Sequence, residues 1–208
     1  MQVVIVGQGY VGLPLAIAAS QAGHSVRGLD INISLIEKLQ RGESPIGDLT
    51  DGEIKAALDS GNYTATQNFA VVKDADVVVI CVPTPLDSKY KPDLSHLESA
   101  LNSIAENLSL ETLVINESTI APGTTRTTVA QILAKSGVPF DLAYSPERID
   151  PANQTWKVTN TPKLVAGLTH QATERARAFY STFVDSVTIG SSLEVIEQLS
   201  CWKIVSAW

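Results

Sequence analysis

The chain begins with a glycine pattern that restricts the choice of possible folds more than any other feature of the sequence. A short apolar run, residues 3–6, is typical of a buried strand. It leads directly into three glycines with the spacing G-x-G-x-x-G, which are Gly7, Gly9 and Gly12. An apolar, alanine-rich stretch from Leu13 to Ala22 then predicts a helix. A strand, a glycine-rich turn and a helix in this order predict the first unit of a dinucleotide-binding α/β fold.

Each glycine of this pattern has a physical reason to be a glycine. Gly7 permits the tight turn out of the strand, and Gly9 lets a pyrophosphate approach the backbone closely. Gly12 lets the helix pack tightly against the strand. The free N–H groups and the dipole at the helix start favour a phosphate bridge. The alternative is a βαβ unit that uses these glycines only for packing.

An acidic residue at the end of the next strand favours the binding interpretation. Asp30 closes the strand predicted for residues 25–29 and follows Gly12 at close to the ~20-residue spacing of a ribose-binding carboxylate. An aspartate here could instead cap the following helix. A carboxylate accepts hydrogen bonds from both ribose hydroxyls and repels a 2′-phosphate, and no Arg directly follows Asp30. The sequence therefore predicts NAD rather than NADP.

Composition excludes several other classes of function. The formal net charge of −7 argues against a nucleic-acid-binding or anionic-membrane surface. The two cysteines, Cys81 and Cys201, form neither a disulfide framework nor a metal cluster, and the three histidines are scattered, so no metal site is expected. The chain begins directly with a core strand, and no apolar run approaches the ~20 residues of a membrane span. We expect a cytoplasmic protein.

Strand and helix patterns alternate along the whole chain. The strongest strand, Val77 to Val82, is apolar without interruption, which indicates a parallel sheet covered by helices on both faces. Further strands are predicted at 25–29, 62–66, 112–115, 140–144, 163–166 and 186–189, and further helices at 34–39, 54–58, 94–108, 122–135 and 171–183. The pattern predicts a doubly wound, mostly parallel Rossmann-type α/β sheet of about eight strands.

Polar residues follow several of these strands, at the sheet edge where ligands bind in such folds. Pro83-Thr84-Pro85 ends the strongest strand sharply, because proline cannot donate to the ladder. Thr84 is a candidate to meet the dinucleotide, although a threonine in a plain turn is an equal alternative. Cys81 is expected to be a small apolar filler with no chemistry.

Four segments together resemble one family. They are GQGYVGLP at 7–14, CVPTP at 81–85, ESTIAPGTT at 117–125 and YSPERIDP at 144–151. In this order they are similar to the UDP-glucose/GDP-mannose dehydrogenase family, over residues 1 to about 195. The SPER form resembles the branch that oxidises UDP-N-acetylhexosamines such as UDP-GlcNAc or UDP-ManNAc to uronic acids. The resemblance implies oxidation of the sugar C6 hydroxyl in two hydride transfers to NAD, with a cysteine thiolate that captures the aldehyde.

The resemblance also implies site residues. Those that would hold NAD are Gly7, Gly9, Tyr10, Val11, Gly12 and Asp30, with Pro83, Thr84 and Thr119 at the nicotinamide end. The catalytic candidates are Thr119 and Glu147, the latter as a base or as a residue that positions the hydrolytic water.

The sequence departs from the family after Glu194. Family members are about twice as long and continue into a central helix with a catalytic Lys, a position at which this chain has Ser200, with Lys203 out of phase. Cys201 does not correspond to the family nucleophile. We therefore expect an NAD-binding domain at 1–190, a truncated or altered start of the central helix at 191–208, and no turnover by this chain alone.

Two other interpretations remain open. The chain could be a stand-alone NAD-binding module, or a regulatory partner of a longer enzyme. Its apolar carboxyl-terminal tail would support self-association, and a UDP-sugar would bind only if the missing domain were supplied.

Overall fold

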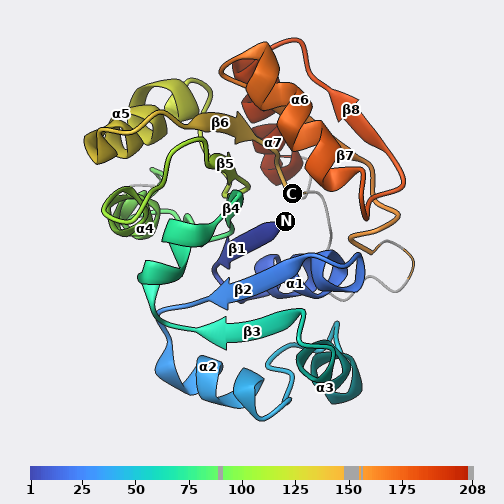
Figure 1. Ribbon diagram of the computed structural model, residues 1–208. Helices are drawn as coiled ribbons and strands as arrows, with labels where there is room; N and C mark the ends of the chain where they lie inside the picture. The colour runs from blue at the N-terminus through green and yellow to red at the C-terminus, as the bar shows by residue number, and fades with distance from the viewer. Residues whose placement is uncertain (89–90, 148–154, 156, 206–208) are drawn as a thin grey trace.

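The computed structural model describes residues 1–88, 91–147, 155 and 157–205. Within these residues, eight strands form one sheet in the order β3-β2-β1-β4-β5-β6-β7-β8 (Figure 1). Their bounds are β1 (Gln2–Val6), β2 (Ser25–Leu29), β3 (Tyr63–Thr66), β4 (Val77–Ile80), β5 (Leu113–Asn116), β6 (Asp141–Tyr144), β7 (Lys163–Gly167) and β8 (Val187–Ile189). The chain switches direction across the sheet between β1 and β4, which is the arrangement of a doubly wound fold.

Helices cover both faces of the sheet. The α-helices are α1 (Gly12–Gln21), α2 (Ile33–Gln40), α3 (Asp51–Asp59), α4 (Ser95–Ala105), α5 (Ala130–Leu133), α6 (His170–Tyr180) and α7 (Leu193–Val205), joined by the short helical turns η1 (Phe69–Asp74), η2 (Thr125–Val129) and η3 (Ala134–Ser136). Side chains of α1, α2, α3 and α6 pack on one face, and those of η1, α4, α5 and α7 on the other. The doubly wound α/β fold predicted from the sequence is confirmed.

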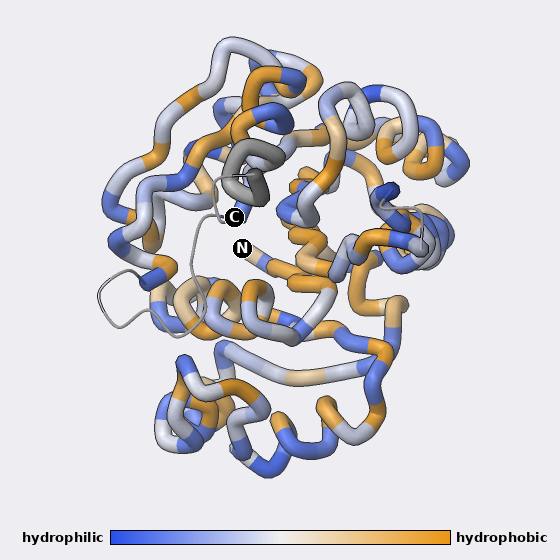
Figure 2. Tube along the Cα trace, turned by 180° about the vertical axis from the view of Figure 1, so that it is seen from behind, coloured by the Kyte–Doolittle hydropathy of each residue, from blue (hydrophilic) through white to orange (hydrophobic). Residues whose placement is uncertain are grey.

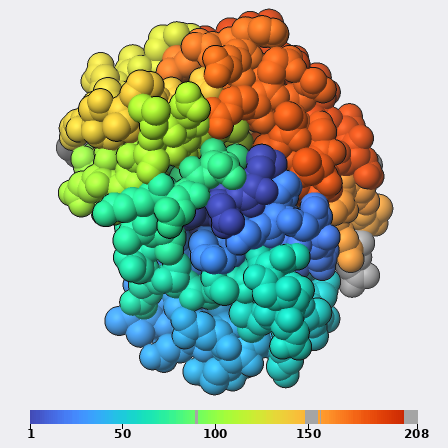
Figure 3. Space-filling view, in the orientation of Figure 1, coloured from blue at the N-terminus to red at the C-terminus, as the bar shows by residue number. Residues whose placement is uncertain are grey.

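Each strand of the centre contributes to two separate apolar cores. Along β1, Val3 and Ile5 belong to one core, whereas Val4 and Val6 belong to the other. All four are at most 3% exposed. This double burial explains the uninterrupted apolar runs of the central strands. Figure 2 shows the apolar residues concentrated along the central strands and hydrophilic residues on the outer helices. In Figure 3 the first residues of the chain, coloured dark blue, lie in the middle of one face of the molecule.

The last two strands, β7 and β8, run against the other six. β6 pairs with β7 in antiparallel fashion, whereas the other pairs of the sheet are parallel. A parallel connection needs a crossover, usually a helix, and the described residues between β6 and β7 contain none. β7 therefore begins at the edge of the sheet where β4, β5 and β6 end.

The first turns of α7 are part of the packed core. Leu193 and Ile196 are buried against the β6–β7 side of the sheet. The carboxylate of Glu197, which has no exposed surface, accepts hydrogen bonds from the backbone N–H groups of Gly123 at 2.5 Å and Thr125 at 2.8 Å. It thus caps the helical segment that begins at Thr125, where free N–H groups favour a negative charge. Residues 206–208 of the tail for which self-association is expected lie outside the described residues.

Replacing Glu197 with glutamine should loosen this attachment. A glutamine offers one neutral acceptor oxygen to two N–H groups, so we expect Glu197→Gln to lower the free energy of unfolding by about 2 kcal/mol. Urea unfolding monitored by tryptophan fluorescence measures the change. The matched control is Glu194→Gln on the same helix, which removes only an exposed ion pair with Arg126 at 2.9 Å and should leave stability unchanged. If Glu197→Gln lowered the free energy of unfolding no more than Glu194→Gln does, the cap would contribute nothing to stability.

None of the helices within the described residues is long and apolar enough to cross a membrane.

Candidate functional site

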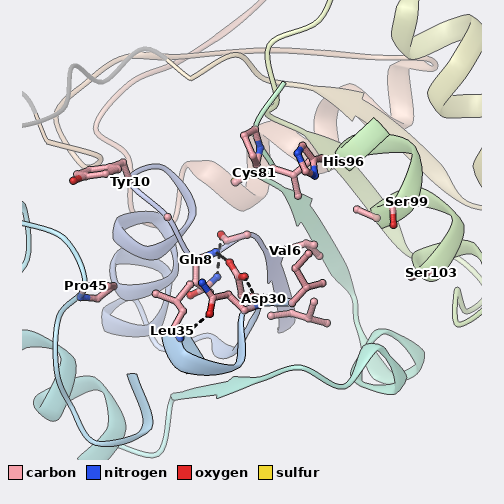
Figure 4. Close-up of a pocket in the computed structure, with 18 of the residues that line it drawn as sticks. Val6, Gln8, Tyr10, Asp30, Leu35, Pro45, Cys81, His96, Ser99 and Ser103 are labelled. Atoms are coloured by element: carbon pink, nitrogen blue, oxygen red, sulfur yellow. Dashed lines mark hydrogen bonds between the residues drawn. The ribbon is translucent and has the colours of Figure 1, made fainter. Parts of the chain in front are cut away.

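A pocket of about 470 Å³ opens at the carboxyl ends of β1, β2 and β4. The glycine turn and Asp30 line it on one side, and His96 and Ser99 of α4 on the other. Figure 4 shows Cys81 and His96 together at one end of this pocket, with Asp30 and Leu35 towards the other. The pocket therefore lies at the β1–β4 switch point, where open α/β sheets bind their ligands.

The three motif glycines have three different surroundings. Gly7 has a φ of +93°, and a Cβ there would lie 2.5 Å from the Cys81 carbonyl oxygen. A Cβ on Gly12 would lie 1.8 Å from the Gly7 carbonyl oxygen. A Cβ on Gly9 would meet no atom of the described residues within 4 Å, so the space above Gly9 is open to them. Gly7 and Gly12 are thus required by the protein's own packing, whereas no contact within the described part of the chain requires Gly9.

The side chain of Gln8 anchors the glycine turn from beneath. It is fully buried and donates to the carbonyl oxygen of Ile5 at 2.8 Å. The buried hydroxyl of Tyr63, on β3, donates to its Oε1 at 2.9 Å. Sequence reasoning missed this anchor because the motif leaves the position between the first two glycines unspecified.

Asp30 is held with both carboxylate oxygens in place. The backbone N–H of Gln8 donates to its Oδ2 at 2.8 Å, and that of Asn32 donates to its Oδ1 at 2.9 Å (Figure 4). Asn32, not Asp30, is the N-cap of α2, because its side chain accepts from the N–H of Leu35. The carboxylate is thus oriented at the rim of the pocket rather than used as the helix cap.

The remaining predicted cofactor residues divide into two groups. Tyr10, which is 57% exposed, and Pro83 line the pocket. Val11, Thr84 and Thr119 are not among its lining residues. The hydroxyl of Thr84 donates to the carbonyl oxygen of Thr119 at 2.7 Å, so the segments that follow β4 and β5 are tied together.

Glu147 belongs to a buried charged cluster that sequence reasoning missed. The ammonium of Lys163 lies 2.7 Å from Glu117 Oε2 and 3.4 Å from Glu147 Oε2. The hydroxyl of Tyr180 donates to Glu117 Oε1, and Lys163 Nζ lies 5.2 Å from the centre of the Tyr180 ring. Lys163, Glu117 and Tyr180 are at most 2% exposed. The sequence feature that could have revealed this cluster is Lys163 itself, a lysine at the start of an otherwise apolar strand.

Burial and the neighbouring charges shift the pKa values of this cluster in opposite directions. It raises the pKa of Glu117 to about 7, although the attraction of Lys163 opposes the rise. The two carboxylates outweigh the effect of burial on Lys163, so its pKa is raised and its ammonium form is favoured. Burial raises the pKa of the neighbouring Cys81 thiol well above its usual value, which disfavours the reactive thiolate.

The structure describes the first half of the YSPERIDP motif at 144–151. Tyr144 to Glu147 are described, whereas Arg148 to Pro151 lie outside the described residues. On α7, Ser200 is 7% exposed.

Comparison with known proteins identifies the family to which this chain is similar. Residues 1–184 match the model of the NAD-binding domain of the UDP-glucose/GDP-mannose dehydrogenase family. The chain is 36% identical over 190 residues to the UDP-N-acetyl-D-mannosamine dehydrogenase of Pyrococcus horikoshii, a match that covers 88% of this chain and 45% of that protein. It is 34% identical over 203 residues to the UDP-N-acetyl-D-glucosamine 6-dehydrogenase of Pseudomonas aeruginosa, covering 95% and 47% of the two chains.

Solved structures give the same result. The structure of the UDP-D-ManNAc dehydrogenase of Pyrococcus horikoshii superposes with a TM-score of 0.92 at 31% identity, covering all of this chain and 50% of that one. A GDP-mannose dehydrogenase from Pseudomonas aeruginosa superposes with a TM-score of 0.91 at 26% identity, with the same coverage. The chain spans about half the length of these relatives.

Proposed function

Since the chain belongs to the UDP-glucose/GDP-mannose dehydrogenase family, whose NAD-binding domain it carries, we propose that it binds NAD in the pocket at the carboxyl ends of β1, β2 and β4. The open space at Gly9 carries this proposal, because the residues that the structure describes pack nothing there and a pyrophosphate needs that approach. The residues present fit the cofactor. Asp30, at the sequence spacing of a ribose-binding carboxylate, is held in a fixed orientation by two backbone hydrogen bonds. The glycine turn leads directly into the start of α1, where N–H groups favour a phosphate.

Each part of the site has a distinct task in this binding mode. The backbone N–H groups at the start of α1 and the open face of Gly9 receive the pyrophosphate. Asp30 accepts hydrogen bonds from the hydroxyls of the adenosine ribose, and its bonds from Gln8 and Asn32 hold it in that orientation. The nicotinamide half then extends over the ends of β4 to β6. Bound NAD supplies a hydride acceptor.

Replacing Asp30 with asparagine should relax the choice between the two dinucleotides. The variant loses two charge-assisted hydrogen bonds to the ribose and the repulsion of a 2′-phosphate. We expect the Kd for NAD to rise about tenfold or more and the preference for NAD over NADP to shrink by a larger factor. Calorimetric titration with both dinucleotides measures these constants. Asp59→Asn, at an exposed position of α3, is the control, and an unchanged NAD/NADP ratio in Asp30→Asn would exclude the ribose role.

We further propose that the parent activity is oxidation of a UDP-N-acetylhexosamine at C6. The SPER segment and the names of the relatives support this substrate class. In this proposal Thr119 and Glu147 stand beside the reacting sugar, and Glu147 serves as a base or orients the hydrolytic water.

We expect this chain to bind NAD without turnover. It spans about half the length of its relatives and has Ser200 where the family resemblance implies a lysine. Its Cys81 is a partly buried thiol with a raised pKa. The test mixes the purified chain with NAD and, in turn, UDP-GlcNAc, UDP-ManNAc and UDP-glucose, and follows NADH absorbance. A rising trace would contradict the expected inactivity, and failure to bind NAD in a parallel titration would overturn the proposed function itself.

A further inference from the structure

One residue of the glycine turn, Gln8, connects the end of β1 to Asp30. Its backbone N–H donates to Asp30 Oδ2 at 2.8 Å. Its side-chain amide points into the core, where Nε2 donates to the carbonyl oxygen of Ile5 at 2.8 Å and to that of Gly7 at 3.3 Å. The orientation of this buried amide therefore determines where the N–H that holds the carboxylate stands.

Tyr63 determines which way the amide faces. Because Nε2 of Gln8 donates to carbonyl oxygens, Oε1 must find a donor, and the Tyr63 hydroxyl supplies it at 2.9 Å. Neither side chain has any exposed surface. Burial raises the pKa of Tyr63 above its ordinary value, and the negative charge of Asp30 raises it further. The phenol therefore stays a neutral donor at physiological pH.

The middle strand of this region leaves space for the contact. Tyr63 of β3 pairs with Val26 of β2, and its hydroxyl reaches the position of Gly28, which lies closer to the pocket edge. A Cβ on Gly28 would lie 2.4 Å from Gln8 Oε1 and 2.7 Å from the Tyr63 hydroxyl oxygen. A side chain there would have to displace one of the two groups, so β1, β2 and β3 together build this hydrogen bond.

We propose that Tyr63 is a positioning residue for the cofactor, which acts through Gln8 on Asp30, although Tyr63 is not among the described residues that line the pocket. Without the hydroxyl, the buried Gln8 oxygen loses its donor, which is costly, and the amide turns to find another. The glycine turn then shifts, and Asp30 loses one of the two N–H groups that orient it towards the ribose. This inference rests on the proposed binding of NAD and deepens it.

The test is a double-mutant cycle on the Kd for NAD, measured by calorimetric titration of the chain. Tyr63→Phe keeps the ring and removes only the hydroxyl, and we expect it to raise the Kd about five- to tenfold. In an Asp30→Ala chain no carboxylate remains to be oriented, so adding Tyr63→Phe should change the Kd by less than about twofold. A general structural effect would instead appear equally in both backgrounds.

The choice between dinucleotides gives a second readout that needs no double variant. A carboxylate fixed towards the ribose repels a 2′-phosphate, whereas a loosened one can turn aside. We expect the ratio of the Kd for NADP to the Kd for NAD to fall about threefold in Tyr63→Phe.

Thr112→Val is the matched control for the loss of a buried hydroxyl. Thr112 is 1% exposed, donates to the Ala75 carbonyl oxygen at 3.1 Å and directly precedes β5, at the opposite edge of the sheet from the pocket. The urea midpoint should fall in both variants, but the Kd should change only in Tyr63→Phe.

Two results would overturn this inference while NAD binding stands. They are an unchanged Kd in Tyr63→Phe, and an equal rise of the Kd on adding Tyr63→Phe to the wild-type and Asp30→Ala chains. Failure of the wild-type chain to bind NAD would overturn the proposed function, and this inference with it.

Discussion

A single methyl group at Gly9 should abolish NAD binding while leaving the stability of the chain unchanged. The Cβ of Gly9→Ala enters open space in the structure, and the residue has no left-handed backbone conformation that an alanine would strain. The same methyl group occupies the position at which a pyrophosphate must approach the backbone. We expect the Kd for NAD to rise by about two orders of magnitude, as measured by calorimetric titration.

Gly12→Ala is the matched control within the same motif. Its Cβ would lie 1.8 Å from the Gly7 carbonyl oxygen and 3.1 Å from the Cys81 Cβ, so the helix must move away from the strand. We expect a loss of about 3 kcal/mol or more in the free energy of unfolding, measured by urea titration. Unaltered NAD binding in Gly9→Ala would place the pyrophosphate elsewhere, whereas equal stability losses in both variants would contradict the different roles of the two glycines.

Removing the Lys163 ammonium should be the most destabilising change of charge in the described core. Lys163→Met leaves Glu117 fully buried without its nearest positive partner, at 2.7 Å in the wild-type chain. Breaking a buried pair in this way costs about 3–5 kcal/mol of stability. Urea unfolding at about pH 8 measures the loss, and Lys135→Met, at an exposed lysine bonded to Asn102, provides the control.

The loss in Lys163→Met should shrink at lower pH. The pKa of Glu117 is about 7 in the fold, above its ordinary value of 4.5, so the folded chain binds a proton that the unfolded chain releases. The contribution of this group to stability is therefore present below about pH 4.5 and is lost as the pH rises to about 7. Without the ammonium, the pKa of Glu117 rises further, so protonation rescues the variant at about pH 5 more than at about pH 8. A pH-independent loss would mean that packing, not charge, explains it.

The glycine turn and Asp30 were predictable from the sequence because their relations are local or nearly so. The strand, the spacing of Gly7, Gly9 and Gly12, and the first helix lie within one short segment, and the structure forms these elements with Gly7 and Gly12 in tight contact. Even the position of Asp30 follows from the length of one βαβ unit. The cofactor roles of these residues, in contrast, stay predictions until a ligand is measured.

The charged cluster was not predictable because it depends on the direction of one strand. No local pattern links Glu117 to Lys163, which follows it 46 residues later. The two residues meet because β7 runs antiparallel to β6. A parallel β7 would have put Lys163 at the opposite edge of the sheet, away from Glu117 and Glu147. Gln8 illustrates a second limit, since its partner Tyr63 lies two strands away and no periodicity links them.

Because α7 is docked on the sheet, this helix is a suitable attachment point for a fused domain in protein engineering. Leu193, Ile196 and Glu197 fasten its first turns to the sheet and to the turn at Gly123, while the helix continues to Val205. A reporter domain joined through an unbroken helix would therefore keep a defined angle to the pocket instead of swinging on a flexible tether. Two fluorophores placed on such a fusion would report changes in the sheet rather than in a linker.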